Sequence, residues 1–138
     1  MTVRISHMRR SALGRLGAAL LLAVGLVGIA CAAEQIVVTA RSGEELPCHV
    51  YYRVDANGKE WPVTIRFTTR PTNGTATTRA VARPVSINGQ TKSVRAVRVV
   101  YRSKSGFIGQ DSFTYRRVTA DPTDPDNGKE YAVAVTVR

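Results

Sequence analysis

The sequence predicts an all-β protein, a sandwich or barrel of about seven to eight short strands. Apolar and polar residues alternate in runs such as WPVTIRF (61–67) and YAVAVTV (131–137), which is the pattern of strands with one buried and one solvated face. Four Asn-Gly dipeptides lie between such runs, and both residues tolerate the positive φ angles of tight hairpins. No stretch carries the 3.6-residue periodicity of an amphipathic helix.

Residues 1–33 have the composition of an export signal peptide. Four arginines and no acid precede the apolar run LGAALLLAVGLVGIA (16–30), and small residues follow, an order typical of a cleaved leader. A retained anchor is disfavoured because a spanning helix needs roughly 20 apolar residues. We expect cleavage after Ala33 and a periplasmic or extracellular domain of residues 34–138 with no transmembrane segment. The alternative is a lipid anchor at Cys31, which follows small residues in GIAC.

Turn residues divide the rest of the chain into successive strands. We expect them at 35–40, 48–54, 61–67, 75–81, 84–87, 93–102, 111–118 and 131–137. A domain of this size buries roughly two-thirds of its chain surface, which suffices for one core between two sheets. We expect that core to contain Trp61, Ile65, Phe67, Phe113, Tyr115 and Val133.

Cys48 is the only cysteine after the leader. In PCHVYYRV the strand period places it on one face with Val50, Tyr52 and Val54, so we interpret it as core filling. A disulfide to Cys31 becomes possible only if cleavage precedes Cys31.

The run GFIGQDSFTYRR (106–117) joins a glycine-broken loop to an aromatic strand through Asp111. Strand parity puts Asp111, Phe113 and Tyr115 on one face. A tyrosine near the start of a late strand fits the tyrosine corner of immunoglobulin-like sandwiches, in which the phenol bonds to nearby backbone. We therefore interpret Asp111 and Tyr115 as structural determinants and not as reactive groups.

Three segments in order resemble the bacterial immunoglobulin-like and cadherin-like domains of exported proteins. They are RPTNGTATT (70–78), VVYRSKSGFIGQDSFTYRR (99–117), with its Gly-x-Asp-Ser-Phe-Thr-Tyr motif, and EYAVAVTVR (130–138). The resemblance implies an immunoglobulin-like antiparallel β-sandwich in an exported setting, although a fold alone does not imply a function. Family members commonly have an apolar residue two places after the motif tyrosine. Here Arg117 stands there, so we expect a bulge that turns Val118 inward.

Residues suited to catalysis are scarce. His49 is the only histidine after residue 33, and Cys48 beside it is expected on the opposite face of the strand, out of reach for a nucleophile–base pair. No His/Cys cluster has metal-binding spacing, and no phosphate-binding glycine loop is present. We expect a non-enzyme without a cofactor.

Positive charge is the main functional signal. Without residues 1–33 the formal charge falls from +10 to +6, and twelve of the sixteen remaining basic residues are arginine, whose planar fork suits carboxylate, sulfate and phosphate. The topology expected for an immunoglobulin sandwich puts Arg66, Arg116 and Arg138 on neighbouring strands with outward parity, and Arg98 and Arg102 on the other sheet. The first three are candidates for binding anionic polysaccharide or lipopolysaccharide phosphate. The same charge also suits an ordinary soluble surface.

Two other functions stay open. One is assembly with an envelope protein or a second copy through a sheet edge. The other is calcium binding by the loop DPTDPDNG through Asp121, Asp124 and Asp126, although the loop has Gly128 where the calcium-loop template needs an acid. Nucleic acid is not an expected partner, because no basic surface interleaved with aromatic residues is evident.

Overall fold

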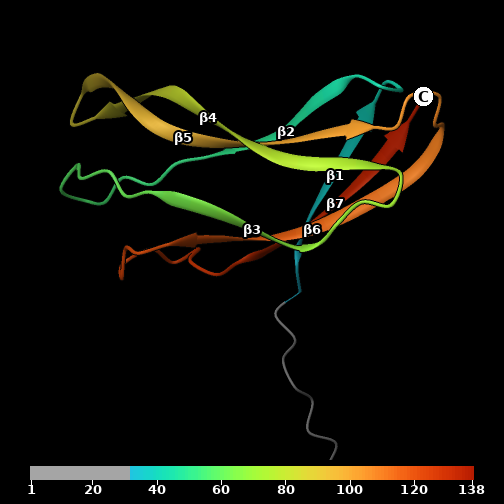
Figure 1. The fold of residues 1–138 in the computed structure, drawn as a ribbon. Coiled ribbons are helices and arrows are strands. Elements are labelled where there is room, and N and C mark those ends of the chain that lie inside the picture. The colour runs from blue at the N-terminus through green and yellow to red at the C-terminus, as the bar shows by residue number, and fades with distance from the viewer. Residues whose placement is uncertain (1–31) are drawn as a thin grey trace, which may run out of the picture. The chain divides into compact units, whose positions relative to one another are not determined.

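The structure is a computed structural model that describes residues 32–138. The expected leader and Cys31 lie outside these residues. The described part holds seven strands (Figure 1): β1 Glu34–Ala40, β2 Glu45–Tyr51, β3 Val63–Thr69, β4 Gly74–Ile87, β5 Gln90–Ser103, β6 Gly109–Thr119 and β7 Glu130–Val137. No helix in this part is long and apolar enough to cross a membrane.

The strands form two sheets that lie over one another as layers (Figure 1). One has the order β1-β7-β6-β3 and the other the order β2-β5-β4. Two packed sheets of four and three strands confirm the predicted all-β sandwich. The first strand, β1, lies beside the last strand, β7, and not in the sheet of β2. This β1–β7 pairing is parallel.

Two of the predicted strands, 75–81 and 84–87, form the single long strand β4. Pro84 interrupts the sequence pattern but not the strand, because β4 is a sheet edge and the missing N–H is not needed on its outer side. The hairpin to β5 turns at Asn88 and Gly89, which have φ angles of 52° and 78°. A two-residue type I′ hairpin turn requires positive φ at both of its central residues.

The core fills the space between the layers with aromatic and β-branched side chains. Phe113, Tyr115 and Val133 are buried as expected, and Ile65 and Phe67 pack against them. The other fully buried large side chains include Tyr101, Val99, Val135 and Val137.

The core prediction is wrong for Trp61. Its indole N–H donates to Asp55 Oδ2 at 3.0 Å, and the Lys59 ammonium lies 3.8 Å from its ring centroid. These local contacts hold the indole in the loop before β3 and away from the core.

The face predicted for β2 is also wrong beyond Cys48. A bulge between Pro47 and His49 inserts one residue, which reverses the parity of everything after it. Tyr51 therefore lies in the core, and Tyr52 does not.

The bulge expected at Arg117 does not occur. The β3–β6 register runs without a shift through Ile65–Arg117 and Thr64–Val118, so Arg117 keeps the inward parity of Tyr115. Its side chain is 6 % exposed, and its Nη1 lies 2.5 Å from Asp124 Oδ2. An ion pair, and not a change of parity, accommodates the charge.

Candidate anion-binding face

The three arginines predicted as one cluster do not come together. Arg66 and Arg116 are direct cross-strand neighbours on β3 and β6. Arg116, however, is opposite Glu130, eight residues before Arg138, which is roughly 27 Å at about 3.4 Å per residue. Glu130 also neutralises Arg116 through an ion pair of 3.1 Å. The predicted three-arginine site is therefore wrong.

The aspartates of the β6–β7 loop are each paired with a cation of the chain. Asp121 Oδ2 lies 2.6 Å from Arg53 Nε, Asp124 bonds to Arg117, and Asp126 Oδ1 lies 3.6 Å from Lys129 Nζ. Among residues 32–138 no three His, Cys, Asp or Glu side chains are arranged to hold a metal ion. Each aspartate of this loop is therefore paired with a basic residue of the chain, in place of the predicted calcium site.

Burial by itself would raise the pKa of Asp121, but the hydrogen bonds to its carboxylate lower the pKa by more. Thr123 donates to Oδ1 from both its hydroxyl and its backbone N–H, and Arg53 donates to Oδ2. Together these contacts hold the pKa of Asp121 below its usual range.

Asp111 is a structural junction. Its carboxylate accepts bonds from the backbone N–H groups of Thr72 (3.1 Å), Asn73 (3.0 Å) and Ser112 (2.9 Å), and from the Tyr101 hydroxyl at 2.8 Å. One side chain therefore ties the β3–β4 turn and β5 to β6.

Tyr115 bonds differently from the expected corner. Its hydroxyl lies 2.7 Å from the hydroxyl of Tyr51, on β2 of the opposite sheet, and not against nearby backbone. Both rings are buried, so the bond links the two layers inside the core.

Cys48 and His49 do not have the properties of an activated pair. Burial raises the pKa of the Cys48 thiol to about 11, and its Sγ lies 3.7 Å from the carbonyl oxygen of Leu46. Burial also lowers the pKa of His49, whose ring packs against Tyr51 at a centroid distance of 4.5 Å. At neutral pH both groups are uncharged.

A group of arginines lies on the outward face of the three-stranded sheet. We call it the arginine face, defined by Arg79 on β4 and by Arg98 and Arg102 on β5. Strand parity produces it, because the alternate positions of the same strands hold core residues such as Ala76, Val99 and Tyr101.

One acid organises this face. Arg79 Nε donates to Glu45 Oε1 at 2.9 Å, and Arg79 Nη2 bonds to Oε2. Since β5 lies between β4 and β2, this forked ion pair crosses the outward face of β5. Val100 is on that face of β5, between Arg98 and Arg102, and is only 2 % exposed.

The guanidinium of Arg98 is incompletely satisfied. It stands directly opposite Arg79 in the β4–β5 register, and like charges in that position repel. Its Nε is buried without a hydrogen-bond partner among the described residues. An anion bound beside Arg98 and Arg79 would relieve the repulsion between them.

A hollow of about 230 Å³ lies beside these groups. Arg79, Arg102, Thr75 and Thr77 line it, so guanidinium and hydroxyl donors converge there. Hydrogen bonding from Arg79, with the nearby charges of Arg102 and Arg98, keeps the pKa of Glu45 below its usual range. The hollow therefore contains several hydrogen-bond donors and one ionised carboxylate. That carboxylate is already bonded to Arg79.

No family model matches the chain, and no curated protein matches it. The chain is similar to amebosin, known from a solution structure, with 13 % identity over 78 % of this chain and 99 % of that chain and a TM-score of 0.42. It is also similar to EhICP2, a cysteine protease inhibitor from Entamoeba histolytica, with 7 % identity over 77 % of this chain and 95 % of that chain and a TM-score of 0.36. At these TM-scores neither similarity bears on function.

Proposed function

We propose that this chain is a non-catalytic, exported immunoglobulin-like module that binds an anionic ligand of the cell envelope or its surroundings. The ligand class is a polysaccharide bearing sulfate or carboxylate, or the phosphate groups of lipopolysaccharide. The observation that carries the proposal is the arginine face, where Arg79 bonds to Glu45 and the charges of Arg98 and Arg102 lie near the same carboxylate.

The residues of this face have different roles. Glu45 holds Arg79 across the sheet, so part of the binding surface is already ordered before a ligand arrives. Arg98 and Arg102 make no ion pair with the acids of residues 32–138. Their forks are free for sulfate or phosphate oxygens.

The test is retention on immobilised heparin, a sulfated polysaccharide, and on polygalacturonate, a carboxylated one. We expect binding to weaken as salt rises, because exposed charges are screened within about 10 Å at 0.1 M salt. The Arg98→Gln/Arg102→Gln variant should elute at clearly lower salt than the parent.

The matched control is Arg66→Gln/Arg138→Gln. It removes the same two charges from outside the arginine face, at residues that also lack an ion pair within the described chain. Equal losses in both variants would show that net charge alone drives adsorption and would overturn the assignment of the face. Salt-independent retention would overturn the electrostatic mechanism.

Protein–protein assembly is the second candidate, favoured by the free edge of β1. This strand ends the four-stranded sheet, and its Val37 is 78 % exposed. Such an edge can accept a strand from a partner. Light scattering tests it: a mass that rises with concentration, and stays monomeric in Val37→Lys, supports assembly, whereas a monomer at all concentrations that captures no envelope protein contradicts it.

A further inference from the structure

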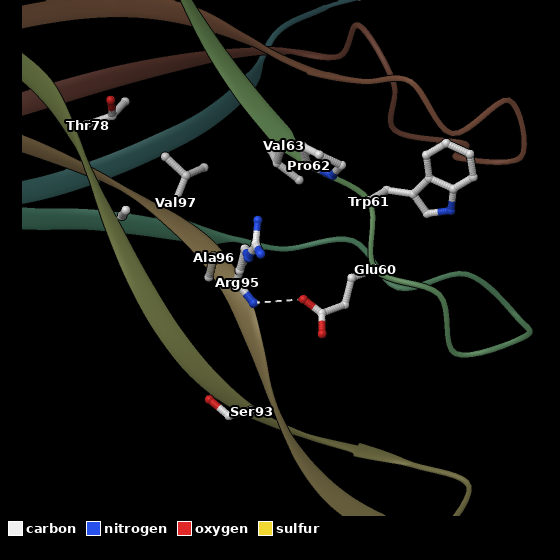
Figure 2. Close-up of a pocket in the computed structure, with 10 residues that line it drawn as sticks. Glu60, Trp61, Pro62, Val63, Thr78, Ser93, Arg95, Ala96 and Val97 are labelled. Carbon is white, nitrogen blue, oxygen red and sulfur yellow. Dashed lines mark hydrogen bonds between the residues drawn. The ribbon is translucent and has the colours of Figure 1, made fainter.

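A cleft of about 700 Å³ opens between the β4–β5 hairpin and the start of β3 (Figure 2). Val63 and Val97 contribute apolar surface to it, and both pack partly against the core. The volume lies in the range of pockets that hold small ligands, about 300–1,000 Å³.

The cleft exists because the long hairpin carries small residues on its inner face. Nearer the middle of the sandwich, inward positions of these strands hold core residues such as Val99 and Tyr101. Farther along, Thr78, Ala80 and Ser93 line the cleft. Their short side chains leave the space between the layers unfilled where the two sheets separate.

One acid and one base line the cleft, and among residues 32–138 only the acid has a charged partner. Glu60 is engaged, since its Oε2 accepts the backbone N–H of Arg95 at 3.2 Å and its Oε1 lies 3.8 Å from Lys92 Nζ. The Arg95 guanidinium forms no ion pair with any acid of residues 32–138. It extends from β5 toward Pro62 and Val63, whereas the Trp61 indole points away (Figure 2).

We infer that this cleft binds a small amphipathic anion, with its apolar body against Val63 and Val97 and its anionic head on Arg95. The ligand class is an aliphatic or aromatic carboxylate, sulfonate or phosphate. The hydroxyls of Thr78 and Ser93 supply further polar contacts along the wall. The site is distinct from the arginine face, because Arg95 has the opposite strand parity from Arg98 and is therefore on the inner face of the β4–β5 hairpin.

The test uses 8-anilinonaphthalene-1-sulfonate, an apolar aromatic body with one sulfonate. Trp61 is the only tryptophan of the chain and borders the cleft, so energy transfer from its indole to the probe reports that the probe is bound to the chain, and the variants below locate it. We expect saturable probe fluorescence, displaced by dodecanoate but not by dodecyltrimethylammonium of equal chain length.

Two kinds of variant define the site. Arg95→Gln removes the charge-assisted contact and should weaken the probe about tenfold or more, whereas Arg98→Gln, on the outer face of the same strand, should leave affinity within twofold. Ala80→Leu should abolish binding by filling the cleft, and Thr78→Leu provides a second filler if the first variant does not fold. Near-ultraviolet circular dichroism verifies the native packing of each variant.

Several results would overturn the inference. These are the absence of probe binding to the parent chain, unchanged affinity in Arg95→Gln or in a folded filling variant, and equal displacement by the dodecyl cation. None of them bears on the arginine face, whose readout is retention on polysaccharide.

Discussion

Replacing Arg117 by methionine should destabilise the fold by about 3–5 kcal/mol, the cost of leaving one member of a buried ion pair alone. The Asp124 side chain is 2 % exposed and has Arg117 Nη1 at 2.5 Å from its Oδ2. Methionine keeps much of the length of arginine, so the main loss is electrostatic. Asp124→Asn should cost a similar amount, because it leaves the guanidinium without a counter-charge, although Asn can still accept the Asp126 N–H that now bonds to Oδ1 at 3.1 Å.

The double variant Arg117→Met/Asp124→Asn separates the charge effect from packing. It contains no unpaired charge, so its loss should be smaller than the sum of the single losses by about 3 kcal/mol. Urea denaturation measures this cycle. With slopes of about 1–3 kcal/mol per molar urea, each single variant should move the midpoint by more than about 1 M.

The adjacent pair Arg116–Glu130 is the control. Its side chains are 57 % and 33 % exposed, so the corresponding cycle with Arg116→Met and Glu130→Gln should give a coupling of less than about 1 kcal/mol. If the coupling of the buried pair is no larger than that of the exposed pair, or if Arg117→Met costs less than 1 kcal/mol, then burial does not set the strength of this contact.

Other predictions concern the core and the loop acids. Tyr115→Phe should cost about 1–3 kcal/mol by stranding the buried Tyr51 hydroxyl, and Tyr51→Phe/Tyr115→Phe should recover most of that loss in urea denaturation. Asp111→Ala should lower the melting temperature more than Asp111→Asn does, because it removes every acceptor from four donors. The depressed pKa of Asp121 means that its stabilisation is present at neutral pH and is lost as pH falls below about 4, so Asp121→Asn should flatten the acid limb of a stability–pH profile. Cys48, with a pKa of about 11, should react with a disulfide reagent at pH 8 much more slowly in the folded than in the denatured chain.

The sheets were largely predictable because strand parity is a local property. The alternating runs at 61–67 and 131–137 contain the observed strands β3 and β7, and their inward residues from Val63 onward face the core. The failures come from single-residue events that composition does not reveal. The bulge at Cys48 moved Tyr51 into the core, and hydrogen bonding to Asp55 kept Trp61 out of it.

The functional surfaces were less predictable because they depend on register and on partners far along the chain. Neighbouring strands for Arg66 and Arg116 follow from the topology, but the distance to Arg138 depends on which residues face each other along β6 and β7. Arg79 joins Arg98 only through the register of the β4–β5 hairpin. The sequence indicated the aspartates of the β6–β7 loop as ligands for an external cation, whereas their partners are cations of the chain itself.

The acids of this domain are mostly used in holding the fold, which locates the remaining positive charge. Asp111, Asp121 and Asp124 are buried and bonded, so they do not offset the surface arginines. Both proposed sites contain arginines of the same strand, β5. Because alternate residues of β5 point to opposite faces, Arg98 and Arg102 serve the arginine face, while Arg95 serves the cleft. Substitution at Arg95 should therefore leave polysaccharide retention nearly unchanged, and substitution at Arg98 and Arg102 should leave probe binding intact. A single site that merely collects anions would lose both activities together.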